Sequence, residues 1–231
     1  MAARPARTRI GQAEMNFEIC RRNMVENQLR PNRVTNEGVL AAMGTVPREK
    51  FAAGSLRGVA YVDEDIPLGN GRFLIEPMVL GRLLQAAEIG SDDVVLDIGC
   101  GTGYTAAVCA RIAATVVALE SDRALADQAG RTLAELGADN VVVVEGPLAR
   151  GYADQAPYDV ILINGAVQEI PDIILGQLGE GGRLTAVVDA PGQAPHAVLA
   201  LNCGGVVSRR KIFDASIPPL PGFERAPGFV F

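Results

Sequence analysis

Histidine and tryptophan are almost missing from this 231-residue chain, which has one histidine, His196, and no tryptophan. A sole histidine with no serine or cysteine partner indicated disfavours triad chemistry and histidine-based metal sites. Cysteine is sparse as well, and no C-x-x-C pair or zinc spacing occurs. We therefore expect no metal, and we expect reduced thiols at the cysteines, which are Cys20, Cys100, Cys109 and Cys203.

Long apolar runs and basic stripes are also absent. No run reaches the roughly 18 apolar residues that a membrane span needs, and residues 1–9 are basic without the apolar segment of a signal peptide. The formal net charge is −6, and the densest basic cluster is Arg209 to Lys211, which disfavours binding to nucleic acid phosphates. We expect a cytoplasmic protein with neither a nucleic acid nor a membrane partner.

Glycine, in contrast, is frequent, with 26 residues, and one glycine-containing stretch is especially informative. The apolar run Val94 to Ile98 contains Asp97 and leads into three alternating glycines, Gly99, Gly101 and Gly103. The segment from Thr105 to Ala114 that follows is typical of a helix. This pattern predicts a strand, a tight turn and a helix, with glycines where a ligand approaches the backbone. A nucleotide-like cofactor is the expected occupant.

The spacing narrows the choice of cofactor. A dinucleotide fingerprint requires glycine or alanine where Tyr104 stands, so NAD is disfavoured. The next predicted strand, Ala114 to Leu119, is followed by Glu120, about 20 residues after the turn, where an acidic side chain can hold both ribose hydroxyls. Asp122 falls instead where a helix N-cap is expected. The alternative is a turn that only closes a strand–helix unit, with Glu120 solvated.

Strand and helix patterns alternate through the last two thirds of the chain, which predicts a doubly wound α/β sheet. The N-terminal part is predicted to be helical, residues 1–12 loosely attached, and residues 68–78 a loop that folds over the cofactor, with Pro77 starting a helix. We expect one compact unit in two parts, 1–78 and 79–231. Further predicted elements are helices at 14–29, 36–43, 122–136 and 171–178, strands at 140–145, 158–164 and 183–188, an antiparallel edge hairpin at 197–201 and 206–213, and a docked tail at 218–231.

The pattern from Asp97 to Gly103 resembles motif I of class I S-adenosylmethionine (SAM) methyltransferases. Nearly the whole chain resembles the protein-L-isoaspartate O-methyltransferase family. The features that carry this resemblance are Met24 to Leu29 with the Val46-Pro47-Arg48 to Phe51 turn, the loop Pro67 to Pro77, the stretch Leu96 to Tyr104, and Ala156 to Asp159 leading to Glu169-Ile170-Pro171, Gln177-Leu178 and Gly181 to Leu184.

The resemblance implies a Rossmann-like, monomeric enzyme that transfers methyl from SAM to the carboxylate of L-isoaspartyl residues in damaged proteins, with S-adenosyl-L-homocysteine as product. The ester then cyclises to a succinimide that can reopen as aspartate. The resemblance places cofactor-binding residues at Asp97, Gly99, Cys100, Gly101, Gly103, Glu120, Gly146 and Pro147, and an acceptor loop at Gly71, Phe73, Leu74, Ile75 and Pro77.

Two positions depart from the family pattern. Ile75 stands at the active-site serine, with Phe73 at the preceding threonine, and Pro147 stands at the aspartate that reads the adenine amino group. Asn164 is either a polar group near the adenine or a purely structural residue. The departures leave two alternatives open, namely a SAM methyltransferase acting on another acceptor, or a non-catalytic SAM-fold protein that binds a partner.

Overall fold

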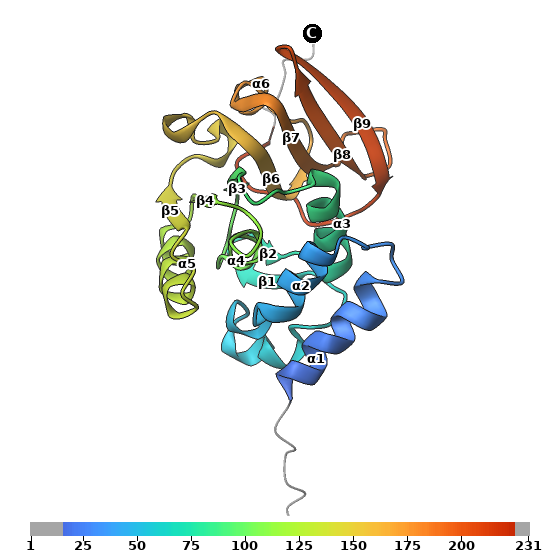
Figure 1. Ribbon diagram of the computed structural model, residues 1–231, viewed down its shortest axis with the longest axis vertical. Coiled ribbons are helices and arrows are strands. Elements are labelled where there is room, and N and C mark those ends of the chain that lie inside the picture. Colours follow the sequence, from blue (N-terminus) through green and yellow to red (C-terminus); the bar gives the residue numbers. More distant parts are fainter. Residues whose placement is uncertain (1–15, 225–231) are drawn as a thin grey trace, which may run out of the picture.

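The computed structural model describes residues 16–224 as a layered α/β structure (Figure 1). The predictions for residues 1–12 and for the tail end at 229–231 lie outside this range. The helices are α1 (Phe17–Met24), α2 (Glu37–Thr45), α3 (Pro77–Ala87), α4 (Tyr104–Cys109), α5 (Arg123–Glu135) and α6 (Asp172–Leu175). The strands are β1 (Ile66–Gly69), β2 (Arg72–Leu74), β3 (Val94–Ile98), β4 (Thr115–Glu120), β5 (Val141–Glu145), β6 (Tyr158–Val167), β7 (Leu178–Val188), β8 (His196–Cys203) and β9 (Val206–Asp214).

Seven of the described strands form one sheet in the order β5-β4-β3-β6-β7-β8-β9. The first five in this order are parallel, and β8 and β9 extend the sheet antiparallel. Strand β6 is buried along almost its whole length, as expected of a parallel strand with both faces covered. The doubly wound α/β fold with an antiparallel edge is confirmed. Because β3 pairs with β4 on one side and β6 on the other, the strand order reverses beside its carboxyl end.

The N-terminal segment is helical, as predicted, and lies at the end of the molecule opposite the β8–β9 hairpin (Figure 1). Asn16 and Asn36 cap α1 and α2 by accepting hydrogen bonds from backbone N–H groups three residues later. Helix α1 continues as a π-helical turn at Val25–Leu29, and short 3-10 turns follow at Arg48–Lys50 and Gly54–Val59. Buried residues on both sides of position 78 share one hydrophobic cluster. The division into 1–78 and 79–231 stays a prediction.

The helix predicted from Pro171 through Leu178 is wrong in extent. Helix α6 ends at Leu175, and β7 already begins at Leu178. Gly182 lies inside β7, where a Cβ would stand 2.8 Å from the carbonyl oxygen of Gly179. Glycine is therefore required there by a close approach of two backbone segments.

The loop predicted between the N-terminal helices and α3 is an antiparallel hairpin made of β1 and β2. Its two-residue turn is Asn70-Gly71, and both residues have positive φ, +49° and +71°. Asn-Gly is the residue pair that favours such a turn, because both positions need left-handed backbone conformations. The hairpin carries the residues expected to form the acceptor loop.

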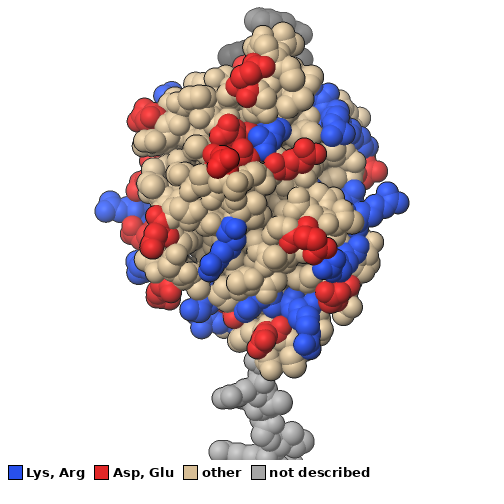
Figure 2. Space-filling view, in the orientation of Figure 1, with Lys and Arg blue, Asp and Glu red and all other residues tan. Residues whose placement is uncertain are grey.

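Charged side chains of both signs are interspersed over the face shown in Figure 2, with wide uncharged areas between them. On this face the described residues form no broad basic stripe. Among residues 16–224, helices long and apolar enough to cross a membrane do not occur.

Candidate active site

The site is built at the carboxyl end of β3, where the strand runs into the glycine turn. Gly99, Gly101 and Gly103 all have positive φ, +78°, +56° and +96°, a backbone region that side chains with a Cβ avoid. Gly103 is the N-cap residue of α4, and its carbonyl accepts the hydrogen bond of Ala107 N–H. The turn between β3 and α4 is buried throughout. The predicted strand, turn and helix are confirmed, although α4 ends at Cys109, before Ala114.

Asp97 lies next to the turn and is fully buried. Its Oδ1 accepts a hydrogen bond from Asn164 Nδ2 on β6, and its Oδ2 has no partner within the described residues. Burial raises the pKa of Asp97 to about 7, and the neighbouring charge of Glu120 adds to this increase, while the hydrogen bond from Asn164 opposes it. The backbone N–H of Ala106 also lowers this pKa and so faces the carboxylate, but Oδ2 makes no hydrogen bond within the described residues and can accept one from a ligand.

Asn164 holds Asp97 in place. Besides donating to Asp97, its Oδ1 accepts a hydrogen bond of 3.0 Å from Thr105 Oγ1 on α4. The side chain thus links β6, β3 and α4 below the glycine turn. Its observed contacts are with protein groups, which favours the structural alternative for this residue.

Glu120 ends β4 and is also fully buried. Its Oε2 accepts hydrogen bonds from Gly101 N–H at 2.7 Å and from Arg72 Nη2 at 2.9 Å. Its Oε1 accepts from the backbone N–H groups of Ser121 at 2.8 Å and Asp122 at 3.1 Å. Glu120 is therefore not solvated, contrary to the alternative interpretation. It joins the glycine turn, the start of α5 and the β1–β2 hairpin.

Asp122 takes the role predicted for it as the N-cap of α5. Its Oδ1 accepts from the N–H groups of Ala124 at 2.8 Å and Leu125 at 3.1 Å. Its Oδ2 accepts a hydrogen bond of 2.6 Å from Asn70 Nδ2 at the tip of the hairpin. The hairpin is thus attached to the end of β4 at two points, through Asn70 and through Arg72.

Two cysteines lie near the turn without the properties of a nucleophile. Cys100 is 6% exposed, and Cys109 on α4 is fully buried. Burial raises the pKa of both thiols well above its usual range, so the reactive thiolate is disfavoured. Cys100 belongs to the wall of the turn, as predicted.

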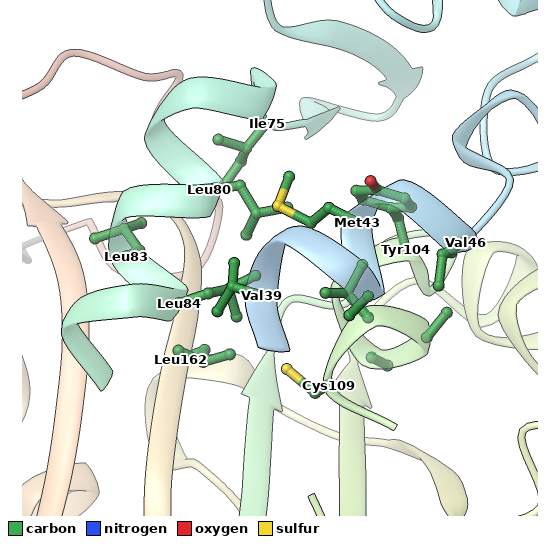
Figure 3. Close-up of a cluster of buried hydrophobic side chains, with 14 of the residues drawn as sticks. Val39, Met43, Val46, Ile75, Leu80, Leu83, Leu84, Tyr104, Cys109 and Leu162 are labelled. Carbon is green, nitrogen blue, oxygen red and sulfur yellow. The ribbon is translucent and has the colours of Figure 1, made fainter. Parts of the chain in front are cut away.

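The acceptor-loop residues divide between the hairpin surface and the core. Gly71 is exposed at the hairpin tip, Phe73 is half-buried, and Leu74 is buried. Ile75 is 4% exposed and lies in a hydrophobic cluster with Met43, Leu80 and Tyr104 (Figure 3). Pro77 occupies the first position of α3, as predicted. The role of these residues in acceptor binding stays a prediction, and for Ile75 the observed surroundings are apolar.

Gly146 and Pro147 follow β5, on the far side of β4 from β3. Gly146 N–H donates to the carbonyl of Glu120 at 3.0 Å, which extends the parallel ladder by one residue. Pro147 is exposed and precedes a 3-10 turn at Leu148–Arg150. This segment offers no carboxylate at the predicted adenine position, so a base lying there would meet a proline ring and backbone groups.

Two arginines important to the site were not identified from the sequence as site residues. Arg72 is 3% exposed and forms the buried ion pair with Glu120. Arg48 is fully buried, donates to the carbonyls of Ala60 and Ile75 at 2.7 Å each, and lies over the Tyr104 ring at 4.8 Å. The surrounding sequence marks neither of them, since Arg48 precedes Glu49 and Lys50 and Arg72 follows a turn, and most arginines are solvated.

Comparisons with known proteins agree with this architecture. A family model described as Protein-L-isoaspartate(D-aspartate) O-methyltransferase matches residues 20–210. A Protein-L-isoaspartate O-methyltransferase of Koribacter versatilis is 38% identical over 206 residues, which cover 89% of this chain and 92% of that protein. One of Methanoculleus marisnigri is 42% identical over 211 residues, covering 90% and 96%.

Solved structures give the same fold. A protein-L-isoaspartate O-methyltransferase superposes with a TM-score of 0.77 at 24% identity, over 88% of this chain and 67% of the other. A Plasmodium falciparum structure, described as such a methyltransferase in complex with S-adenosyl-L-homocysteine, gives 0.75 at 18% identity, over 90% and 100%. At these identities the structures support the fold alone, and the family follows from the sequence matches. The chain belongs to the protein-L-isoaspartate(D-aspartate) O-methyltransferase family, whose members are SAM-dependent methyltransferases.

Proposed function

We propose that the protein transfers a methyl group from SAM to the side-chain carboxylate of L-isoaspartyl residues in damaged proteins. The observation that carries the proposal is the pair of buried carboxylates, Asp97 and Glu120, at the carboxyl ends of neighbouring parallel strands. They flank a glycine turn beside the point where the strand order reverses, which is where α/β sheets bind nucleotide-like cofactors.

The residues around the turn fit SAM in two respects. Asp97 Oδ2 is buried and unpartnered, so it can accept a hydrogen bond from the amino group of the cofactor's amino acid end. Gly99 and Gly101 present no Cβ to a ligand that approaches the turn. Glu120 is the expected partner of the ribose hydroxyls, and it must exchange its ion pair with Arg72 to serve in that role.

When bound, SAM supplies an electrophilic methyl group. The chain then has to align the acceptor and keep water away, since an acceptor carboxylate is already ionised at neutral pH and needs no strong base. Asp97 and Glu120 would fix the cofactor. Side chains of the β1–β2 hairpin and of residues 218–223 lie against the turn and would shield the reacting groups from solvent.

A second candidate is methyl transfer to a different acceptor. Ile75, at the position of the family's serine, is buried and carries no hydrogen-bonding side-chain atom, and Phe73 beside it carries none either. An acceptor held by a serine hydroxyl would lose that contact here. A non-catalytic protein that binds a partner is the third possibility, and the open Oδ2 of Asp97 favours a ligand over it.

The test is methyl transfer from labelled SAM to an isoaspartyl peptide, with the matching aspartyl peptide as control. SAM binding is followed by calorimetry on the same sample. Transfer to the isoaspartyl peptide alone is the expected result. Binding without transfer would favour another acceptor, and the absence of both from folded protein would favour the partner-binding alternative. The monomeric state and cytoplasmic location stay predictions, which sedimentation and cell fractionation test.

A further inference from the structure

The face of the glycine turn that a cofactor would approach is covered by the chain's own side chains. A Cβ added to Gly99 would lie 2.7 Å from Arg72 Nη2 and 2.9 Å from Leu220 Cδ1. A Cβ added to Gly101 would lie 2.9 Å from Leu68 Cδ1. The space beside these glycines, which a ligand would use, is therefore filled by side chains of the protein. A ligand can reach the turn only when Arg72, Leu220 and Leu68 move.

Arg72 makes the polar part of this cover. Its Nη2 pairs with Glu120 Oε2 at 2.9 Å, and the side chains are 3% and 0% exposed. Both carboxylate oxygens of Glu120 then accept two hydrogen bonds from N–H groups, because Oε2 also accepts from Gly101 N–H and Oε1 accepts from Ser121 and Asp122 N–H. Arg72 Nε, however, is buried without a partner among the described residues. A pair that leaves a buried donor unpaired is less favourable than a complete one, and so it can be displaced more readily.

The element that carries Arg72 is small, and it joins the end of β4 through the side chains of Asn70 and Arg72. It is a two-stranded hairpin, and such hairpins have little stability of their own. Its tip is held by the exposed hydrogen bond from Asn70 to Asp122. The tip also lies against residues 218–223, since a Cβ on Gly71 would stand 3.3 Å from Pro221 Cγ.

Residues 218–223 form the apolar part of the cover. Ala166 N–H donates to the carbonyl of Pro218, and Leu220 N–H donates to the carbonyl of Ala166, both at 2.8 Å. This pairing directs Leu220, which is 2% exposed, onto Gly99 and Gly165. The docking predicted for the tail end at 229–231 lies outside the described residues, but residues 218–223 lie on the turn.

We propose that Arg72 competes with the cofactor for Glu120. The guanidinium and the ribose hydroxyls are alternative partners of one buried carboxylate, and the cofactor enters only when the hairpin at 66–74 lifts Arg72 away. The proposal rests on the proposed function for the identity of the ligand. Arg72 is then a determinant of cofactor affinity, and the hairpin is a gate over the site.

The test measures the affinity of S-adenosyl-L-homocysteine for wild type, Arg72→Gln and Arg72→Met by titration calorimetry. The matched control is Arg123→Gln, which removes the same charge from an exposed position at the start of α5. We expect both Arg72 variants to bind about tenfold more tightly than wild type or more, and the control to bind as wild type does. Equal or weaker binding by the Arg72 variants would overturn the competition.

Asn70→Gly provides a second variant that leaves the buried pair intact. Glycine keeps the left-handed turn conformation but removes the hydrogen bond to Asp122. We expect binding about threefold tighter than wild type, because closure loses one exposed hydrogen bond. Unchanged affinity of Asn70→Gly would show that movement of the hairpin does not limit cofactor binding.

The outcomes separate the two proposals. If wild type binds as tightly as Arg72→Gln, the competition fails and the cofactor site stands. If neither wild type nor any variant binds, the proposed function fails, because the Arg72 variants have no competitor left at Glu120.

Discussion

Ile75→Ser restores a hydroxyl at the position of the family's active-site serine, and the structure predicts that it costs stability instead of creating a functional site. Ile75 is only 4% exposed, and its neighbours are apolar. Truncating a buried isoleucine to alanine costs about 2 to 5 kcal/mol, and a buried hydroxyl without a partner adds about 1 kcal/mol or more. We expect Ile75→Ser to lower the free energy of unfolding by about 4 kcal/mol.

The assay is urea unfolding followed by circular dichroism, with Ile75→Val and Ile173→Ser as controls. Ile75→Val keeps the shape of the site and should cost about 1 kcal/mol. Ile173 is 57% exposed, so Ile173→Ser should change stability by about 0.5 kcal/mol. The midpoint should fall with an unchanged slope. If Ile75→Ser is as stable as Ile173→Ser and gains methyl transfer, the side chain at 75 faces the acceptor, and the interpretation of this position is wrong.

Three further predictions concern Asp97, Gly99 and Arg48. Because the pKa of Asp97 is raised from 3.8 to about 7 in the folded protein, its contribution favours folding below pH 4 and is lost as the pH rises toward 7. The stability of wild type relative to Asp97→Asn should fall by about 4 kcal/mol across this window, and a flat difference would contradict it. Gly99→Ala should destabilise the protein by about 2 kcal/mol or more in thermal unfolding, because φ at this position is +78° and the new Cβ would lie 2.7 Å from Arg72 Nη2. The control Gly130→Ala, in α5 with open space around it, should be neutral or stabilising. Arg48→Met leaves two buried carbonyls unpaired and should cost about 3 kcal/mol or more by urea unfolding; a cost no greater than that of exposed Arg57→Met would refute the role assigned to Arg48.

The sheet and its turn were predictable because their signals are local. Strand β6 is apolar over most of its length, and the glycines of the turn follow β3 directly. The spacing of apolar residues and the composition therefore both predict a buried parallel sheet with a glycine turn. The caps at Asn36 and Asp122 follow from the preference of short polar side chains for helix starts. Glu120 was singled out by its spacing from the turn, and the structure places it, buried, against Gly101 of that turn.

What the sequence left out depends on contacts between distant residues. Arg72 and Glu120 are 48 positions apart, and the sequence alone gives no reason for an arginine in a short hairpin to turn inward. The helix expected through Leu178 ends at Leu175, because Leu178 already pairs with Tyr158 of β6 as the first residue of β7. Hairpin β1–β2 was missed because Pro67 and two glycines indicate a loop, although Asn70-Gly71 is a hairpin signal.

The central claim is that Glu120 serves both Arg72 and the cofactor, and a crystal structure of the protein with S-adenosyl-L-homocysteine tests it most directly. We predict the ribose hydroxyls on Glu120, Arg72 withdrawn from it, and Asp97 Oδ2 engaged by the ligand. A structure with the ligand elsewhere, or with Arg72 still paired to Glu120 beside a bound ligand, would contradict the account.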